Sequence, residues 1–478
     1  MSDEKKPSTE DAHIARFQNQ SLGQPPEGAN ILKFAGISLV GVFLFLTPLP
    51  HGQAFNIPLG IAIDWLRGVF SQIEVGQYNL GSMGLHYLLA LIAITASLLG
   101  SVLAYTVKPG FLVNNPKVRE IFQCSPVYFA SKAIGFAVIW MIFLDVGPDF
   151  VIRSWTGDLM LSLVAGLVVI FIFLAPAMPL VTDFGLMEFI GVSIKKAVRF
   201  LFTLPGRASV DLMASWFGSS AASVIITRGQ HERGFYTGRE AAVIATNFSF
   251  VSLPFSFVIA STIGLQAYFL LFYLIVCITC VILALIMPRI WPLRSLPDTY
   301  LEGVGKQIEE DVPQNVSTGQ WALRLACERA RRSTAAGVAR AGAMNYLNIF
   351  MDLIPIILSW GTLALIVVEF TEIFDTISLP MGGFLHILGV EGAFEFATAT
   401  LVGFIDMYIP ALLIVDAPFQ TRVILGALSI VQIIYMAETG VLIVKSKMPL
   451  NVWKLLVLFL MRTVLALPVI VLLTRLFF

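Results

Sequence analysis

Two broken apolar segments decide how this sequence folds: ASVDLMASWFGSSAASVIIT at 208–227 and EGAFEFATATLVGFIDMYIPALLIV at 391–415. Each has a glycine near its middle, Gly218 and Gly403, beside small or polar residues. Each half is only about 9 residues long, whereas a helix needs about 20 residues to cross a membrane. We therefore expect two re-entrant helical hairpins with their tips at the membrane centre. Non-helical backbone at that depth needs surrounding protein or a water-filled cavity, which makes both hairpins candidate sites.

The composition indicates a membrane protein. Of the 478 residues, 57% are hydrophobic and only 13% are charged, with 31 Lys and Arg against 31 Asp and Glu. A soluble globular protein carries about 25% charged residues and cannot bury this much apolar side chain in one core. The composition therefore excludes a soluble enzyme, a disordered protein and a nucleic-acid binder.

The lengths of the apolar runs predict an all-α polytopic membrane protein with about nine transmembrane helices plus the two re-entrant hairpins. Segments 57–72 and 184–203 carry charges at helical spacing and are expected to be interfacial helices, and 374–390 is a weaker case. Residues 1–30 are expected to be a disordered cytosolic tail, and 31–128 a set of N-terminal scaffold helices. The expected spans are 32–50, 84–105, 129–147, 159–181, 238–264, 266–289, 343–370, 422–444 and 452–475.

Lys and Arg orient these spans, because positive residues favour the cytosolic side. They cluster in 106–128, 182–207 and 290–341, and are sparse in 51–83 and 148–158. The distribution predicts a cytosolic N-terminus, a cytosolic loop at 290–341 and a periplasmic C-terminus. The setting we expect is a bacterial inner membrane.

An internal repeat relates 129–289 to 342–478. Gly403 lies 185 positions after Gly218, and the same offset pairs Ser215 with Thr400 and Asn247 with Gln432. Each copy contributes three spans, an odd number, so the second copy is expected to be upside down relative to the first. Inverted repeats with broken helices that meet at the membrane centre are typical of secondary transporters.

Polar residues inside these apolar segments are the candidate site residues, because an unsatisfied polar group in hydrocarbon costs several kcal/mol. At the tip of the first hairpin, Ser219 and Ser220 place hydroxyls and free N–H groups at a helix start, which favours polar or anionic ligand groups. Close helix packing is the alternative explanation for such small residues. In the second hairpin, Asp406 is a candidate for ion coupling, although it could instead cap a half-helix.

The span after each hairpin adds further candidates. Asn247 and Ser249 lie in 238–264. In 422–444 the candidates are Gln432, which the offset of 185 pairs with Asn247, and Thr439. Glu438 is a second carboxylate in an apolar segment, and an interfacial position is its alternative explanation. Together, Asp406 and Glu438 could bind H⁺ or Na⁺ as the coupling ion.

Enzymatic motifs are missing from the sequence: there is no P-loop, no H-E-x-x-H and no G-x-S-x-G. We expect neither an ATP-driven pump nor an enzyme. We also expect no cofactor and no resident metal, because the cysteine pair Cys277 and Cys280 lies in an apolar run without a histidine nearby.

The sequences WFGSSAAS (216–223), TGREAAVIATNFSFVSLPFSFVIA (237–260), FIDMYIPALLI (404–414) and MAETG (436–440) resemble the nucleoside-recognition (Gate) domain membrane proteins, in particular their YjiH-like branch. More distantly, the chain is similar to the concentrative nucleoside transporters. The resemblance covers roughly 130–478 and implies a fold with two gate repeats. It also implies that Ser219, Ser220, Asn247, Asp406 and Glu438 line a central site.

The function we expect is secondary active transport of a small polar solute, such as a nucleoside, amino acid or organic anion, coupled to H⁺ or Na⁺. The alternative is a non-transporting gate-domain protein that scaffolds or gates another membrane subunit. The expected partners are the solute and the lipid bilayer, with a second membrane subunit or a homo-oligomer left open, and no nucleic acid.

Overall fold

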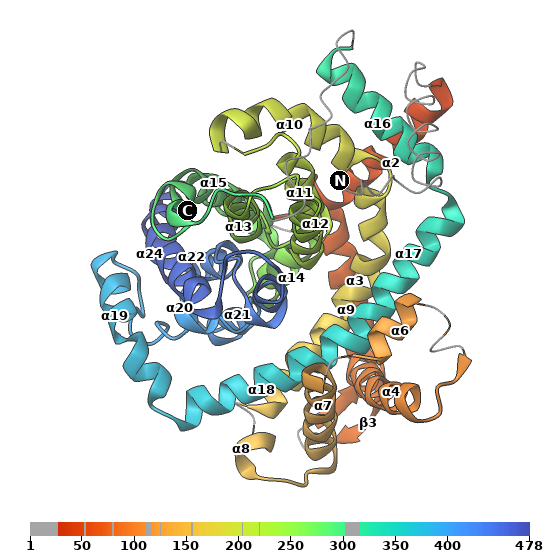
Figure 1. Ribbon diagram of the computed structural model, residues 1–478. Coiled ribbons are helices and arrows are strands. Elements are labelled where there is room, and N and C mark those ends of the chain that lie inside the picture. The colour runs from red at the N-terminus through yellow and green to blue at the C-terminus, as the bar shows by residue number, and fades with distance from the viewer. Residues whose placement is uncertain are drawn as a thin grey trace.

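The computed structural model describes residues 27–478 except for 52–53, 79–80, 111–113, 115, 125, 154–155, 203, 219 and 302–315. In this part of the chain the fold is helical apart from two short β-hairpins (Figure 1). Six of its helices are long and apolar enough to cross a bilayer, which confirms the predicted all-α polytopic membrane fold. The six are Gly28–Leu46, Leu85–Thr106, Asp149–Thr182, Gln266–Arg289, Ala335–Val367 and Val452–Phe477.

The N-terminal part combines long helices with the two β-hairpins, in which β1 pairs with β2 and β3 with β4, both antiparallel. The predicted tail lies outside the described residues as far as residue 26, and the first helix begins at Gly28. The elements are α2 (Gly28–Leu46), β1 (Leu49–His51), β2 (Ala54–Asn56), α3 (Pro58–Gln72), β3 (Glu74–Tyr78), β4 (Gly81–Gly84), α4 (Leu85–Thr106) and α6 (Pro116–Phe122).

The middle of the chain holds the first predicted hairpin and the helices around it. Thr237 and Glu240 form a capping box that satisfies the first free N–H groups of α13. The elements are α7 (Pro126–Leu144), α8 (Asp149–Ile152), α9 (Gly157–Thr182), α10 (Leu186–Phe202), α11 (Ala208–Met213), η1 (Ala214–Gly218, a π-helix), α12 (Ser220–Glu232), α13 (Gly238–Asn247), α14 (Leu253–Thr262), η2 (Gln266–Tyr268), α15 (Phe269–Ile286), η3 (Met287–Arg289) and η4 (Leu293–Ser295).

The last part repeats this order of elements. The predicted cytosolic loop 290–341 contains α16 and the start of α17, which continues through a π-helix into α18. The elements are α16 (Thr318–Arg332), α17 (Ala335–Asn348), η5 (Ile349–Leu353, π), α18 (Ile354–Phe370), α19 (Ile373–Ile387), α20 (Ala399–Val402), α21 (Ile409–Leu413), α22 (Phe419–Val431), η6 (Met436–Gly440, π), α23 (Val441–Val444) and α24 (Val452–Phe477).

Two of the predicted spans are wrong as continuous helices. The span at 238–264 is divided into α13 and α14, and the span at 422–444 is divided into α22 and the η6–α23 segment. The physical reason is that side chains, described below, satisfy the backbone groups that each break leaves free. The amphipathic segments at 57–72, 184–203 and 374–390 are helical, as α3, α10 and α19.

The long helices α9, α17 and α18 run between α4, α6 and α7 on one side and the hairpins on the other (Figure 1). The first two helices, α2 and α3, pack on α9. α9 packs along α17 and α18, while α7 packs on α18 and α4 packs on both α7 and α9. The hairpins and broken helices lie together on the other side of these helices, with α24 beside α15 and α22.

A buried ion pair connects α7 to the π-helix η5, which lies between α17 and α18. Lys132 on α7 is fully buried, and its Nζ lies 3.1 Å from Oδ1 of Asp352 in the π-helix η5. The same Nζ donates a 2.7 Å hydrogen bond to the carbonyl of Ile121 and lies 5.8 Å from the ring centre of Phe122. A membrane-embedded charge is tolerated when such partners surround it.

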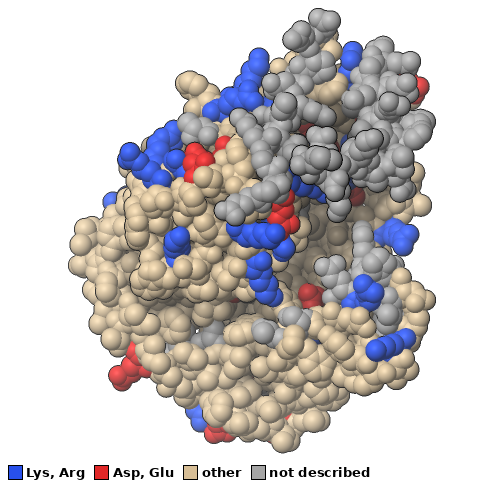
Figure 2. Space-filling view, viewed as in Figure 1, with Lys and Arg blue, Asp and Glu red and all other residues tan. Residues whose placement is uncertain are grey.

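Charged side chains cover only part of the surface. Figure 2 shows Lys and Arg gathered mainly over the upper part of the face that contains α10 and α16, with broad uncharged areas elsewhere. Arg329 of α16 pairs there with Asp183 at 3.2 Å and with Glu188 of α10 at 3.7 Å. These ion pairs hold the amphipathic helix α10 against α16.

Candidate functional site

Two helix breaks form the centre of the candidate site. The first separates Asn247, the last residue of α13, from Leu253, the first residue of α14. The second follows Val431, the last residue of α22, and ends where η6 begins at Met436. An offset of 185 carries residue 247 onto 432, so the two breaks are separated by the offset of the predicted repeat.

Local chemistry explains why the first helix restarts where it does. Pro254 stands in the first turn of α14, where a missing N–H has no consequence. The hydroxyl of Ser252 accepts a hydrogen bond from the N–H of Phe255 at 3.4 Å and so caps the new helix.

The second break contains no proline or glycine, and side chains stabilise it instead. Ile433 has φ +63°, an unfavourable conformation for a β-branched residue. The hydroxyl of Tyr435 accepts from the N–H of Ile433 at 3.0 Å and donates to the carbonyl of Ile430 at 2.8 Å. Thr439 accepts from the N–H of Tyr435 at 3.2 Å and donates to the carbonyl of Ile433 at 3.0 Å. Strained backbone that is held in this way is typical of functional sites.

One arginine, Arg462 of α24, joins the two breaks. Its side chain is fully buried, and its Nε donates a 2.8 Å hydrogen bond to the carbonyl of Val431. Its Nη1 donates to Oδ1 of Asn247 at 2.7 Å and to the carbonyl of Thr246 at 3.4 Å. The C-terminal ends of α13 and α22 therefore both meet a positive charge, which the partial negative charge of a helix C-terminus favours.

No carboxylate among the described side chains forms an ion pair with Arg462. The thiol of Cys280 on α15 also interacts with the guanidinium. A fully buried guanidinium held mainly by carbonyl and amide dipoles retains its positive charge at the junction, because Arg stays protonated in proteins.

The neighbouring residue, Thr463, connects the second break to the second hairpin. Nε2 of Gln432 donates to the hydroxyl of Thr463 and to the carbonyl of Thr400, both at 2.8 Å. Gly403 at the hairpin tip lies so close to this amide that a methyl group placed there would be 2.1 Å from Oε1 of Gln432. The structure thus brings Asn247 and Gln432 to adjacent residues of α24.

The first hairpin consists of two packed arms. We use this name for Ala208–Glu232, which extends beyond the predicted 208–227 and in which α12 packs against α11 and η1. The hydroxyl of Ser215 donates a 2.6 Å hydrogen bond to the carbonyl of Phe250 inside the first break. The hairpin is therefore attached to the broken helix of its own repeat.

The second hairpin, residues 391–415, is less regular, because only α20 and α21 are helical. It is nevertheless attached to the break in the corresponding way: the N–H of Met436 donates to the carbonyl of Phe404 at 2.8 Å. It also reaches the other repeat, because the hydroxyls of Tyr408 and Thr262 on α14 are 3.0 Å apart. In the other direction, α12 of the first hairpin packs against η6 and α23.

The comparisons with known proteins agree with this arrangement. The family model described as nucleoside recognition, the Gate domain, matches residues 164–266, from within α9 to the start of η2. A protein of Alkalihalophilus pseudofirmus, whose function is uncharacterized, is 41% identical over 454 residues, which cover 94% of this chain and 95% of the relative. The chain belongs to the same family as this relative and contains a Gate domain. No solved structure matches it.

The Gate-domain match ends at residue 266 and therefore covers the first repeat through the first hairpin, α13 and α14. Ser215, Asn247 and Phe250 lie inside the match, whereas Arg462 and Gln432 lie beyond it. The central junction is thus formed by the Gate domain together with the second repeat and the last helix.

The structure places the remaining predicted site residues as follows. Ser219 and the side chain of Glu438 lie outside the described residues. Ser220 is buried at the start of α12, and Ser249 is buried inside the first break. Thr439 is buried and satisfies backbone groups of the second break.

Asp406 lies shortly before α21. Its Oδ1 accepts a 2.8 Å hydrogen bond from the N–H of Tyr408, the residue that precedes α21, and no described side chain caps the first N–H groups of that helix. This carboxylate is not part of the hydrogen-bond network of Arg462.

Two buried polar residues, one at the junction and one in the first hairpin, were not singled out from the sequence, although each interrupts an apolar segment. Arg462 is a charged residue in the middle of the apolar run 452–475, and such residues are functional candidates by default. Asp211 lies inside the first hairpin and is 1% exposed.

Some buried polar atoms at the junction make no hydrogen bond to any described residue. They include the hydroxyl of Ser249 and Oε1 of Gln432. Both residues lie within two positions of a residue that Arg462 binds. Because buried polar groups are almost always satisfied in proteins, these atoms are the natural contacts for a water molecule or a polar ligand.

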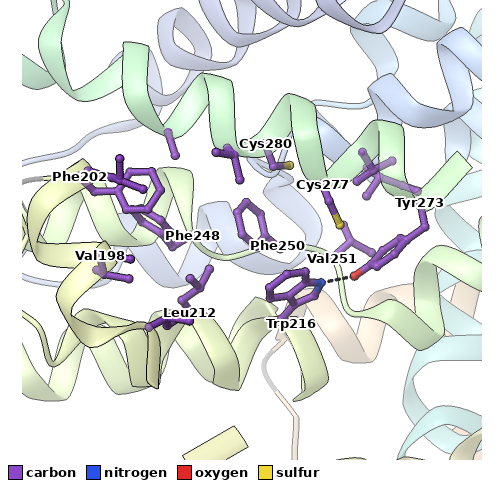
Figure 3. A pocket seen from close by; sticks show the side chains of 17 residues that line it. Val198, Phe202, Leu212, Trp216, Phe248, Phe250, Val251, Tyr273, Cys277 and Cys280 are labelled. Carbon is purple, nitrogen blue, oxygen red and sulfur yellow. Dashed lines mark hydrogen bonds between the residues drawn. The ribbon is translucent and has the colours of Figure 1, made fainter. Parts of the chain in front are cut away.

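An apolar cavity of about 200 Å³ lies beside the first break, between α10, η1 and α15 (Figure 3). Phe248 and Phe250 of the break form part of its wall, and the indole N–H of Trp216 donates to the hydroxyl of Tyr273. Since these two polar groups satisfy each other, the cavity presents an essentially apolar surface. A polar solute is better matched by the atoms of the junction than by this cavity.

Proposed function

We propose that this Gate-domain protein is a secondary active transporter that binds a small polar solute at the two helix breaks. The observation that carries the proposal is that both breaks, one from each repeat, meet at Arg462 while each hairpin is bonded to the break of its own repeat. Movement of either hairpin would therefore change the surroundings of the same central site, which is what alternating access requires.

The solute we propose is a nucleoside, amino acid or organic anion. The hydroxyl of Ser249 and Oε1 of Gln432 supply a donor and acceptors, and the guanidinium of Arg462 supplies positive charge. The Gate-domain match makes nucleosides the first solutes to test. We place the chain in the YjiH-like branch of the family and in a bacterial inner membrane, with a cytosolic N-terminus and a periplasmic C-terminus.

We further propose that transport is coupled to H⁺ or Na⁺ and involves no enzymatic step or cofactor. Asp406 and Glu438 are the carboxylates of the second repeat that this proposal assigns to the coupling ion. Uptake of [³H]uridine into proteoliposomes under a proton or sodium gradient tests the assignment with Asp406→Asn and Glu438→Gln. Glu395→Gln, an exposed carboxylate of the same segment as Asp406, is the control. Undiminished gradient-driven uptake in both variants would exclude these carboxylates as the coupling groups.

A matched pair of serines tests the site itself. Ser249 and Ser256 are both fully buried between Asn247 and Thr262, but the hydroxyl of Ser256 already donates to the carbonyl of Ser252 at 3.0 Å. Ser249→Ala should raise the half-saturation concentration about 10-fold, the effect of one lost hydrogen bond to a ligand, without lowering the melting temperature. Ser256→Ala should leave uptake unchanged. Equal uptake parameters in the two variants would remove Ser249 from the site.

The alternative function, a non-transporting partner that scaffolds or gates another membrane subunit, is an outcome of the same experiments. It predicts neither uptake nor exchange of solute in proteoliposomes. It also predicts that the chain purifies together with a second membrane protein.

A further inference from the structure

Asp211 is a buried carboxylate that connects the two arms of the first hairpin. It stands on α11 and is 1% exposed. Its Oδ2 accepts a 3.0 Å hydrogen bond from the hydroxyl of Thr227 on α12, and its backbone carbonyl accepts from the hydroxyl of Ser223 at 3.1 Å. Residue 211 lies seven positions before Gly218, and residue 227 lies seven positions after Ser220, so this contact joins opposite points of the two arms.

No Lys, Arg or His of the described residues forms an ion pair with Asp211. The positive charge of Arg207 attracts the carboxylate from beyond ion-pair distance, because its guanidinium lies over the ring of Phe235, 4.0 Å from the ring centre. The hydroxyl of Tyr236 also interacts with Asp211. A buried carboxylate without a counter-ion takes up a proton more readily than one in water.

The other titratable groups nearby are engaged elsewhere. Nδ1 of the buried His231 lies 2.9 Å from the carbonyl of Tyr236. On α10, which packs on α11, the side chain of Lys195 lies against Gly206 and Glu188 pairs with Arg329. On α13, Glu240 caps its own helix. Asp211 is therefore the buried carboxylate that links α11 to α12 of the first hairpin.

The arm that carries Thr227 faces the second repeat. α12 packs against η6 and α23, and a cavity of about 220 Å³ is lined there by Val224, Ile225 and Arg228 of α12 and by Leu442 of α23. The cavity leaves room for this arm to move relative to the second repeat. Thr227 thus stands on the helix that contacts the second repeat, and its hydrogen bond ties this helix to the buried carboxylate of Asp211.

We propose that Asp211 is a proton-binding site of the transport cycle, and that its protonation loosens the first hairpin by weakening the hydrogen bond from Thr227. The inference rests on the proposed function: it names H⁺ as the coupling ion and adds Asp211 to Asp406 and Glu438 as a group that binds it. The proton comes from water and adds to a carboxylate oxygen, and no bond between heavy atoms changes. A hydrogen bond to an ionised carboxylate is about twice as strong as one to a neutral group, so protonation reduces the force that holds α12 against α11.

Amide hydrogen exchange of the full chain in lipid nanodiscs tests the structural step. Peptides from Ser220–Glu232 are compared at pH 5.5 and 8.0, after correction for the intrinsic pH dependence of exchange, with peptides from α24 as the internal reference. We expect α12 to exchange at least 5-fold faster at pH 5.5 in the native chain, and at equal rates in Asp211→Asn. Thr227→Val should exchange rapidly at both pH values, and it provides the test if Asp211→Asn does not fold. A pH difference that persists in either variant would overturn the inference.

Two transport measurements separate this inference from the proposed function. Exchange of [³H]uridine at equal concentrations inside and outside proteoliposomes needs no gradient, whereas accumulation driven by a pH gradient needs the coupling site. Asp211→Asn should keep exchange within 2-fold of the native rate and lose at least 90% of accumulation. If Asp211→Asn accumulates uridine normally, Asp211 is not a coupling site, and the proposal of uridine transport is unaffected. If the native chain shows no exchange of uridine but α12 still responds to pH through Asp211, the proposal of proton binding is supported and that of uridine transport is contradicted.

Discussion

Nη1 of Arg462 donates a 2.7 Å hydrogen bond to Oδ1 of Asn247, which lies 215 positions earlier in the chain. The same guanidinium binds the carbonyl of Val431, the last residue of α22. One side chain thus completes the ends of two broken helices that belong to different copies of the repeat.

Removal of this guanidinium should destabilise the whole protein. Arg462→Met leaves the carbonyls of Thr246 and Val431 and the amide oxygen of Asn247 buried without a donor. At about 1–3 kcal/mol for each unsatisfied group, we expect the free energy of unfolding to fall by at least about 3 kcal/mol. Thermal unfolding in detergent measures this, with Arg475→Met at the exposed end of the same helix as control. Equal melting temperatures for the two variants would contradict the prediction.

The close approach of the second hairpin to Gln432 depends on a glycine. In Gly403→Ala, the new methyl group would lie 2.1 Å from Oε1 of Gln432, whose amide is held by Thr400 and Thr463. We expect the hairpin to be displaced, with a lower melting temperature and loss of uptake. Gly383→Ala on α19 has open space around it and should be neutral or slightly stabilising. A Gly403→Ala protein with native stability and uptake would show that the hairpin tolerates displacement.

The ion pair between Lys132 and Asp352 should also stabilise the fold. Lys132→Met leaves Asp352 without its cation, and we expect a loss of up to about 3 kcal/mol. The double variant Lys132→Met/Asp352→Leu should recover part of this loss, because it removes the uncompensated charge. Thermal melting of the two single variants and the double variant gives the coupling between the residues. Strictly additive effects would mean that the pair contributes nothing as a pair.

The last turn of α16 should respond to acid. Hydrogen bonds from Arg331, and from Arg332, all at 2.8 Å, hold the pKa of Glu328 below its usual range. A lowered folded-state pKa stabilises the helix above the ordinary pKa of Glu, and this stabilisation is lost as the pH falls through the lowered value. Amide exchange in Thr318–Arg332 should therefore accelerate between pH 5 and pH 3, after intrinsic correction. Glu328→Gln should remove this acceleration, and a variant that behaves like the native chain would assign it to another group.

The hairpins and the offset of the repeat could be predicted because they leave local marks: Gly218 and Gly403 interrupt apolar runs at an interval that later residues repeat. The helix breaks could not. Around Asn247 and Gln432 the composition is equally apolar on both sides of the break. A prediction based on the length of apolar runs therefore gives one continuous span where the structure has two helices. Pro254 is a local mark of an interruption, but the backbone leaves the helix several residues earlier, after Asn247.

Arg462 escaped prediction for a related reason. A run of about 24 apolar residues accommodates one charge without losing its character as a span, and the partners of this arginine are the carbonyls and amide of distant segments. Asp406 shows the opposite case. Its carboxylate stood out in the sequence, but its described hydrogen bond is to the N–H of Tyr408, two residues away.

The position of Arg462 on α24, which follows α13 and α22 in the chain, has a consequence for biogenesis. The ribosome has synthesised α13 and α22, and the insertion machinery has received them, before the residue that completes both of their ends exists. Until α24 enters the membrane, the carbonyls of Thr246 and Val431 lack the donor that Arg462 provides in the folded protein. The central junction therefore cannot form before α24 has been inserted. Loss of α24 alone would leave the ends of both α13 and α22 without their arginine.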